Sequence, residues 1–180
     1  MSKSKQTTRK NANGNSSLKP AVRTFDALVG TAFCIGNCPW APGTMGAFAG
    51  LVVWYVLTLL LGTGAVLNAL MMLLAIIVTL ISIRPISRLE LSWGEDPRRV
   101  VIDEVVGVWI ALLAVPADGN LWWSLAAFAL FRLFDIYKPF GIRRMEQLGG
   151  GWGVMMDDVL AGMYSGIVLM IARICLINIA

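Results

Sequence analysis

The sequence of 180 residues contains no histidine, three cysteines and few charges, and each of these shortages excludes a class of chemistry. Without histidine, a phosphohistidine intermediate and the usual histidine-containing zinc sites are excluded. The odd number of cysteines argues against a disulfide framework, so we interpret them as free thiols. A cysteine nucleophile for phosphate chemistry is excluded as well, because no arginine follows Cys34 or Cys38 six residues later.

Charged residues make up only 14% of the chain and hydrophobic residues 57%, with a mean hydropathy of +0.71. A soluble domain has about 25% charged and about 45–50% apolar residues, so the composition predicts an integral membrane protein. The net charge of +4 does not indicate nucleic-acid binding, because six of the fifteen basic residues lie in or beside a polar N-terminal segment. We expect residues 1–20 to be a disordered, basic cytoplasmic tail and residues 21–180 to form one helical membrane domain.

The apolar segments predict an all-α membrane bundle of about four to five membrane segments, with re-entrant or interfacial segments left open. The expected segments are 47–61, 65–83, 100–115, 121–136 and 159 to the C-terminus. Both arms of the hairpin 100–136 are short, so the sequence does not decide whether this hairpin spans. The basic loops all fall on one side of this topology, with Arg173 as the exception. The positive-inside rule then places the N-terminus and these loops in the cytoplasm.

Carboxylates occur in these apolar segments, near the expected cytoplasmic boundary. Seven of the eleven acidic residues converge there: Asp26, Asp96, Asp103, Glu104, Asp135, Asp157 and Asp158. An unpaired carboxylate in hydrocarbon costs about 2.5 to 3.5 kcal/mol, so these groups need positive partners. Because the chain offers no histidine, the carboxylates favour a hard cation, and Mg²⁺ suits a site that also receives phosphate.

An alternative explanation is that acids at helix N-termini stabilise the helix dipole, and one pair such as Asp103 and Glu104 is explained in that way. Two adjacent pairs, together with Asp135 close to Lys138 at a helix end, favour a metal site instead. Arg132, Asp135 and Lys138 follow at three-residue spacing and therefore share one helical face.

Two glycine-rich segments, 36–46 and 149–153, precede expected helices on the same side of the membrane. Such segments allow backbone N–H groups to approach a phosphate, although most of them are simple turns. Thr44 in the first segment is expected to donate a hydrogen bond to substrate or to act as the N-cap of the following helix.

Several schemes of phosphate chemistry are excluded because their motifs are absent. There is no GxxxxGK[ST] loop, no DxDx[T/V] motif of aspartyl-phosphate phosphatases and no phosphatidyltransferase signature. Metal-assisted attack of water on a phosphate ester remains possible. The alternative hypothesis is a membrane cation transporter or channel with acids along its path, and a structural membrane subunit is a third. The gathering of the acids at one edge, beside glycine-rich segments, favours the enzyme.

Four stretches in order, GNCPWAPGTMG, EDPRRVVIDEVVG, FRLFDIYKPF and GGGWGVMMDDVLAG, resemble the motifs of the phosphatidylglycerophosphatase A family. The resemblance covers roughly residues 25–170. It implies an all-α enzyme of the bacterial inner membrane that uses Mg²⁺ to hydrolyse phosphatidylglycerophosphate to phosphatidylglycerol. The sequence departs from the family pattern at Gly141, where a second proline is common.

Within these motifs, residue chemistry and the resemblance together suggest roles. The Mg²⁺ ligands are expected among Asp96, Asp103, Glu104, Asp157 and Asp158. The catalytic residues are expected to be Asp103, Asp135, Lys138 and Asp157, with Asp135 either a further ligand or the base that orients water. The substrate phosphates are expected to contact Thr44, Arg132, Lys138, Arg143 and Arg144. Arg98 and Arg99 are equally explained as positive-inside residues. The expected partner is a phospholipid in the membrane, not nucleic acid, and the sequence identifies no protein partner.

Overall fold

The structure, a computed structural model, describes residues 21–117, 120–139 and 141–179. It confirms the prediction of an all-α membrane bundle, because the described residues form helices and no strand. The expected tail 1–20 lies outside the described residues. In chain order the elements are α1 Thr24–Gly30, the short 3₁₀ helix η1 Ile35–Asn37, α2 Pro42–Leu61, α3 Ala65–Trp93, α4 Ile102–Leu112, α5 Leu121–Tyr137, α6 Ile142–Glu146 and α7 Gly150–Ile179.

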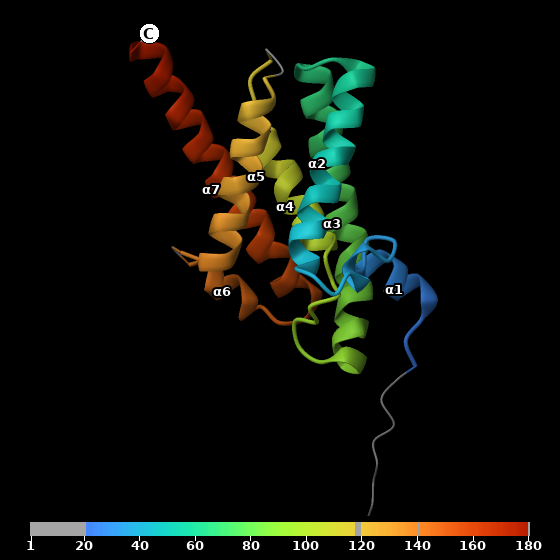
Figure 1. The fold of residues 1–180 in the computed structure, drawn as a ribbon. Coiled ribbons are helices and arrows are strands. Elements are labelled where there is room, and N and C mark those ends of the chain that lie inside the picture. The colour runs from blue at the N-terminus through green and yellow to red at the C-terminus, as the bar shows by residue number, and fades with distance from the viewer. Residues whose placement is uncertain (1–20, 118–119, 140, 180) are drawn as a thin grey trace, which may run out of the picture.

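Among the described residues, three helices are long and apolar enough to cross a membrane, namely α2, α3 and α7. Helix α4 has 11 residues and is about 17 Å long, which is too short for a hydrocarbon core of about 30 Å. It is almost wholly buried and packs against α2, α3, α5 and α7. The short first arm of the predicted hairpin is therefore the central helix of the bundle (Figure 1).

Three of the predicted helix boundaries are wrong. Helix α2 begins at Pro42 rather than at residue 47, because proline is well suited to the first turn of a helix. Helix α3 continues beyond residue 83 to Trp93 and so includes Arg84 and Arg88. Helix α7 begins at Gly150 rather than at residue 159, so the glycine-rich segment is mostly helical. Hydropathy marks only the part of a helix that lies in lipid, and α3, about 44 Å long, extends beyond it.

Small residues allow the helices of the site to approach closely. A Cβ atom at Gly107 in α4 would lie 2.8 Å from the carbonyl oxygen of Asp158, and one at Gly162 in α7 would overlap the carbonyl oxygen of Gly107. A Cβ at Gly151 would likewise overlap the backbone of Ile83 in α3. Close backbone contact of this kind is a common basis of helix association in membranes. The second glycine-rich segment therefore serves helix packing at Gly151, and its contact with phosphate stays a prediction.

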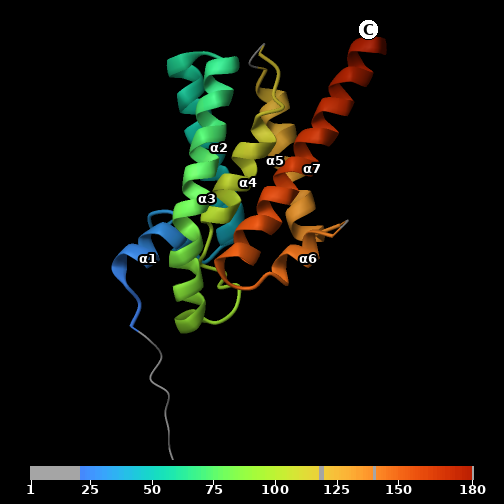
Figure 2. The ribbon, with the colours of Figure 1, turned by 180° about the vertical axis from the view of Figure 1, so that it is seen from behind.

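The bundle has two distinct ends, which Figures 1 and 2 show from opposite sides. The α2–α3 turn, the end of α4, the start of α5 and the C-terminal end of α7 lie at one end. Helices α1 and α6 and the segments leading into α4 and α7 lie toward the other. Helix α7 leans away from its neighbours as it approaches its C-terminus.

Candidate active site

A polar pocket of about 490 Å³ lies in the half of the bundle nearer to α6. Its walls come from the segment before α2, the α3–α4 connection, the start of α4, the end of α5 and helix α7. Among the residues that line it are six acids and three basic residues: Asp96, Asp103, Glu104, Asp135, Asp157, Asp158, Arg98, Arg132 and Lys138. With a formal charge of −3 on these side chains, the pocket favours a cation.

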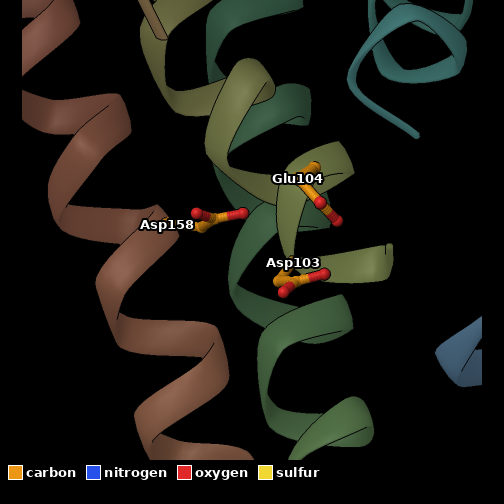
Figure 3. Close-up of side chains that lie close together, drawn as sticks. All are labelled: Asp103, Glu104 and Asp158. Atoms are coloured by element: carbon orange, nitrogen blue, oxygen red, sulfur yellow. The ribbon is translucent and has the colours of Figure 1, made fainter. Parts of the chain in front are cut away.

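Three of these carboxylates form a cluster, which we call the carboxylate triad: Asp103, Glu104 and Asp158. Each offers one oxygen, and the three oxygens all lie within 4.8 Å of one another. Figure 3 shows Asp103 and Glu104 on the start of α4, with Asp158 extending toward them from α7. Each of the three also has a buried oxygen without a hydrogen-bond partner among the described residues. Because buried polar atoms are rarely left unpartnered, the triad fits a bound cation.

Burial changes the acidity of the two triad residues on α4. It raises the pKa of Asp103 from 3.8 to about 6, and it raises the pKa of Glu104 well above 4.5, with the charge of Asp103 as the next cause. Carboxylates that are buried without enough positive charge behave in this way. A divalent cation among them would favour their ionised forms.

Two of the three basic side chains of the pocket, Lys138 and Arg132, are held by acidic side chains. Lys138 Nζ donates to Asp157 Oδ2 at 2.6 Å. Arg132 donates to Asp135, and its Nη1 lies 3.9 Å from Glu104 Oε1. Lys138 ends α5 in a left-handed conformation with φ 45° and ψ 57°, which is uncommon for a residue other than glycine. Uncommon backbone conformations of this kind occur often at functional sites.

The structure separates the five predicted metal ligands into two groups. Asp103, Glu104 and Asp158 form the triad. Asp157 lines the same pocket, but its Oδ2 accepts from Lys138 and its Oδ1 accepts from the backbone N–H of Asp158 at 3.0 Å. Asp96 also lines the pocket, where it is exposed and its N–H donates to Glu90 Oε1 at 3.4 Å. Neither Asp157 nor Asp96 is part of the triad.

The predicted substrate-binding residues separate in a similar way. Arg132 and Lys138 line the pocket, whereas Thr44, Arg143 and Arg144 are not among its lining residues. Thr44 lies in the first turn of α2 but is not its N-cap, which is Ala41.

Arg98 lines the pocket, although the sequence offered no signal that distinguished it from Arg99. The first glycine-rich segment does reach the pocket, because Pro42 and Gly43 are part of the lining.

Asp26, the seventh acid that the sequence placed at this boundary, is not part of the pocket lining. It is 1% exposed, and its Oδ1 accepts a hydrogen bond from Arg88 Nη1 at 3.2 Å. This ion pair joins α1 to α3. The seven acids that the sequence places at one boundary therefore do not all belong to one pocket, because Asp26 pairs with a basic residue of α3 that sequence spacing did not indicate.

Comparisons with known proteins were made over the whole chain. A family model described as phosphatidylglycerophosphatase A matches residues 28–173. A putative phosphatidylinositol-3-phosphatase of Bacteroides thetaiotaomicron is 52% identical over 147 residues, which are 81% of this chain and 92% of that protein. A phosphatidylglycerophosphatase A of Haemophilus influenzae is 40% identical over 145 residues, covering 79% and 85% of the two chains. That of Escherichia coli is 35% identical over 145 residues, covering 79% and 80%. No solved structure matches.

Proposed function

Because the chain belongs to the phosphatidylglycerophosphatase A family, we propose that it hydrolyses the terminal phosphate of phosphatidylglycerophosphate, releasing phosphatidylglycerol and inorganic phosphate. The family resemblance of the four motifs is confirmed, and the matched residues 28–173 agree with the expected range. Membership makes the chain a phosphatase, and it gives no support to the alternative of a transporter or channel.

The observation that favours this function most is the carboxylate triad beside basic side chains in one pocket. Each of the three carboxylates has a buried oxygen without a partner among the described residues, which fits a hard divalent cation, so Asp103, Glu104 and Asp158 would hold Mg²⁺. When bound, this ion would polarise the phosphate oxygens and offset the negative charge of the transition state. The proposal of Mg²⁺ thus rests on the type, burial and proximity of the ligands.

The other residues of the pocket would bind the phosphate and orient the attacking water. Lys138 and Arg98 are the cations placed to contact phosphate oxygens. The first N–H groups of α2 have no partner within the helix, and Gly43 brings them to the pocket wall. Arg132 contacts both Asp135 and Glu104 and so positions them. Asp135 would accept a proton from the water as it attacks phosphorus.

We also propose that the pocket faces the cytoplasm and that the membrane is the bacterial inner membrane. Basic residues gather toward the pocket end of the bundle: Arg84, Arg88, Arg98, Arg99, Arg143 and Arg144. The positive-inside rule favours this end for the cytoplasm. In that orientation the acyl chains of the substrate remain in the leaflet while its charged head group enters the pocket.

The identity of 52% to a protein described as a putative phosphatidylinositol-3-phosphatase favours a second candidate substrate, phosphatidylinositol 3-phosphate. Both lipids present a phosphate monoester on a polar head group to the membrane surface. The proposed chemistry of the pocket is the same for both, and only the contacts to the remaining head group differ.

The test is phosphate release by the purified protein in detergent, with either lipid as substrate. We expect rapid release from phosphatidylglycerophosphate in Mg²⁺ and its loss in excess EDTA. Faster release from phosphatidylinositol 3-phosphate would support the second substrate. No release from either lipid by folded protein would contradict the proposed function, and release that EDTA leaves unchanged would contradict the metal site.

Replacing Asp157 with Asn tests whether Asp157 and Asp158 have different roles in the site. The sequence alone predicts that this change abolishes phosphate release, as for a metal ligand. Because Asp157 holds Lys138 in the structure, we expect a rate about 10- to 100-fold lower, the usual cost of losing a supporting contact, with Mg²⁺ affinity retained. Calorimetric titration with Mg²⁺ measures this affinity. If the variant binds Mg²⁺ more weakly than the unmodified protein, Asp157 is a metal ligand after all. Lys138→Met also removes a cation that contacts the phosphate, so it should lower the rate at least as much as Asp157→Asn does.

A further inference from the structure

A second cavity lies at the end of the bundle opposite to the carboxylate triad. It has a volume of about 570 Å³ and is lined by the start of α3, the segment that follows α4 and the C-terminal part of α7. We call it the far-end cavity. Figure 2 shows α7 leaning away from the other helices at this end. Its described walls are mostly apolar, with Val115, Met170 and Ile174 among them, and its polar side chains are Asn68 and Arg173.

The α3–α4 side of this cavity is held together by hydrogen bonds. Asn68 Nδ2 donates to the carbonyl oxygen of Leu113 at 3.4 Å. The hydroxyl of Thr63 donates to the carbonyl oxygen of Ala117. The ends of α3 and α4 are thus tied to each other, while Arg173 faces the cavity from α7.

Arg173 is the basic residue that departs from the positive-inside pattern. It lies 23 residues after the start of α7, which is about 35 Å along the helix axis. It lines the cavity beside Gly64 and Ala65, at the turn between two helices that are long enough to cross a membrane, so we place it near the membrane boundary opposite to the triad. The described residues that line the cavity include no acid, and Arg173 forms no salt bridge with the described part of the chain.

We propose that the far-end cavity binds one anionic phospholipid of the leaflet opposite to the triad, with its phosphate on Arg173 and an acyl chain along the apolar walls. A guanidinium at the membrane boundary attracts the phosphates of anionic head groups, and it matches the geometry of a phosphate through paired N–H donors. A free phosphate ion would leave the apolar walls without a partner. The charge of Arg173 together with these walls therefore fits a phospholipid.

The experiment measures lipid bound to the full-length protein. The purified protein in detergent is incubated with equal amounts of phosphatidylglycerol and phosphatidylcholine, and native mass spectrometry measures the retained lipids. We expect retained phosphatidylglycerol in excess over phosphatidylcholine. Arg173→Gln should lower its retention about tenfold, as expected for a lost charge-assisted contact, and Arg173→Lys should lower it less.

A second variant tests the cavity separately from the charge. Ala65 lines the cavity and is exposed at the first position of α3, so Ala65→Trp should fold while filling the cavity with Arg173 intact. It should lower retention as Arg173→Gln does. Arg84→Gln, at an exposed arginine of α3 outside this cavity, is the matched control and should retain lipid normally. The rate of phosphate release should stay unchanged in Arg173→Gln and Ala65→Trp.

Three results would overturn the proposal. One is equal retention of the two lipids by the unmodified protein. Another is normal retention in Arg173→Gln. The third is normal retention in Ala65→Trp together with loss in Arg173→Gln, because that combination describes a head group held at the surface and not in the cavity. Thermal unfolding of each variant verifies that the compared proteins are folded.

Discussion

Asp158→Asn is expected to lower the rate of phosphate release about a thousandfold, the largest effect of any single substitution considered. Asp158 supplies the only triad carboxylate that comes from α7, so its loss leaves the cation with ligands from α4 alone. A bound metal ion contributes several kcal/mol of transition-state stabilisation, and about 4 kcal/mol corresponds to a thousandfold in rate. Asparagine has nearly the same shape, so the packing between α4 and α7 should persist.

The same substitution should not destabilise the protein in the absence of metal. Asp158 is 3% exposed and its Oδ2 has no partner among the described residues, so neutralising it removes a cost of burial. In EDTA we expect the Tm of Asp158→Asn to equal or exceed that of the unmodified protein. Mg²⁺ should raise the Tm of the unmodified protein but not that of the variant, because a ligand stabilises only the state that binds it.

Asp26→Asn is the matched control, since Asp26 is also a buried carboxylate but pairs with Arg88 outside the pocket. It should lower the Tm and leave the rate per folded molecule unchanged. A Mg²⁺-dependent rise of Tm in Asp158→Asn, or a rate within tenfold of the unmodified protein, would contradict the role of Asp158 as a ligand.

Gly43→Ala is expected to lower the rate about a hundredfold while changing stability little. A Cβ at Gly43 would overlap Glu104 Oε1 and lie 3.3 Å from Arg132 Nη1. The overlapped atom is the end of a flexible side chain, so Glu104 can move aside without unfolding any helix. The carboxylate would then leave its place in the triad, and a displacement of about 1 Å at a catalytic site costs about a hundredfold.

The measurement for Gly43→Ala is the rate of phosphate release at several Mg²⁺ concentrations, together with the Tm. We expect a weaker apparent affinity for Mg²⁺ and a Tm close to that of the unmodified protein. Met45→Ala is the control, because Met45 is in the same turn of α2 but is exposed and does not line the pocket. A rate for Gly43→Ala equal to that of Met45→Ala would show that the contact between α2 and Glu104 is unimportant.

Much of the candidate site was predictable, because burying a charge in a membrane protein is costly. Charged residues are therefore rare in apolar segments, and those that do occur there are easily recognised in the sequence. Asp103, Glu104, Asp135, Lys138 and Asp158 were all predicted as site residues, and they do line one pocket. Some predicted substrate-binding residues do not line the pocket, and their contact with substrate stays a prediction. Arg143 and Arg144 follow the same motif as Lys138, but they lie exposed on α6, where no lining residue of the pocket is found.

The distinction between Asp157 and Asp158 could not be predicted, since both are acids next to each other in an apolar helix. Successive residues of a helix point about 100° apart, so Asp158 faces the two acids at the start of α4 and Asp157 faces Lys138 at the end of α5. Which residue takes which role depends on where α4 and α5 lie around α7. The close packing at Gly107 and Gly162 sets that arrangement, and pairing between distant glycines is not visible in a pattern of hydropathy.

By itself, the sequence determined that the protein is an all-α membrane protein and that it belongs to the family. It also excluded phosphate chemistry that depends on histidine or on a P-loop. Each of these conclusions depends on composition or on residues close together in the chain. The tertiary structure alone decided which carboxylates form the triad, that Asp26 belongs to an ion pair with Arg88, and that Arg98 rather than Arg143 or Arg144 lines the pocket. The physical reason is that these facts depend on distances between side chains of different helices. Such distances follow from helix crossings made by small residues, and no local pattern encodes them.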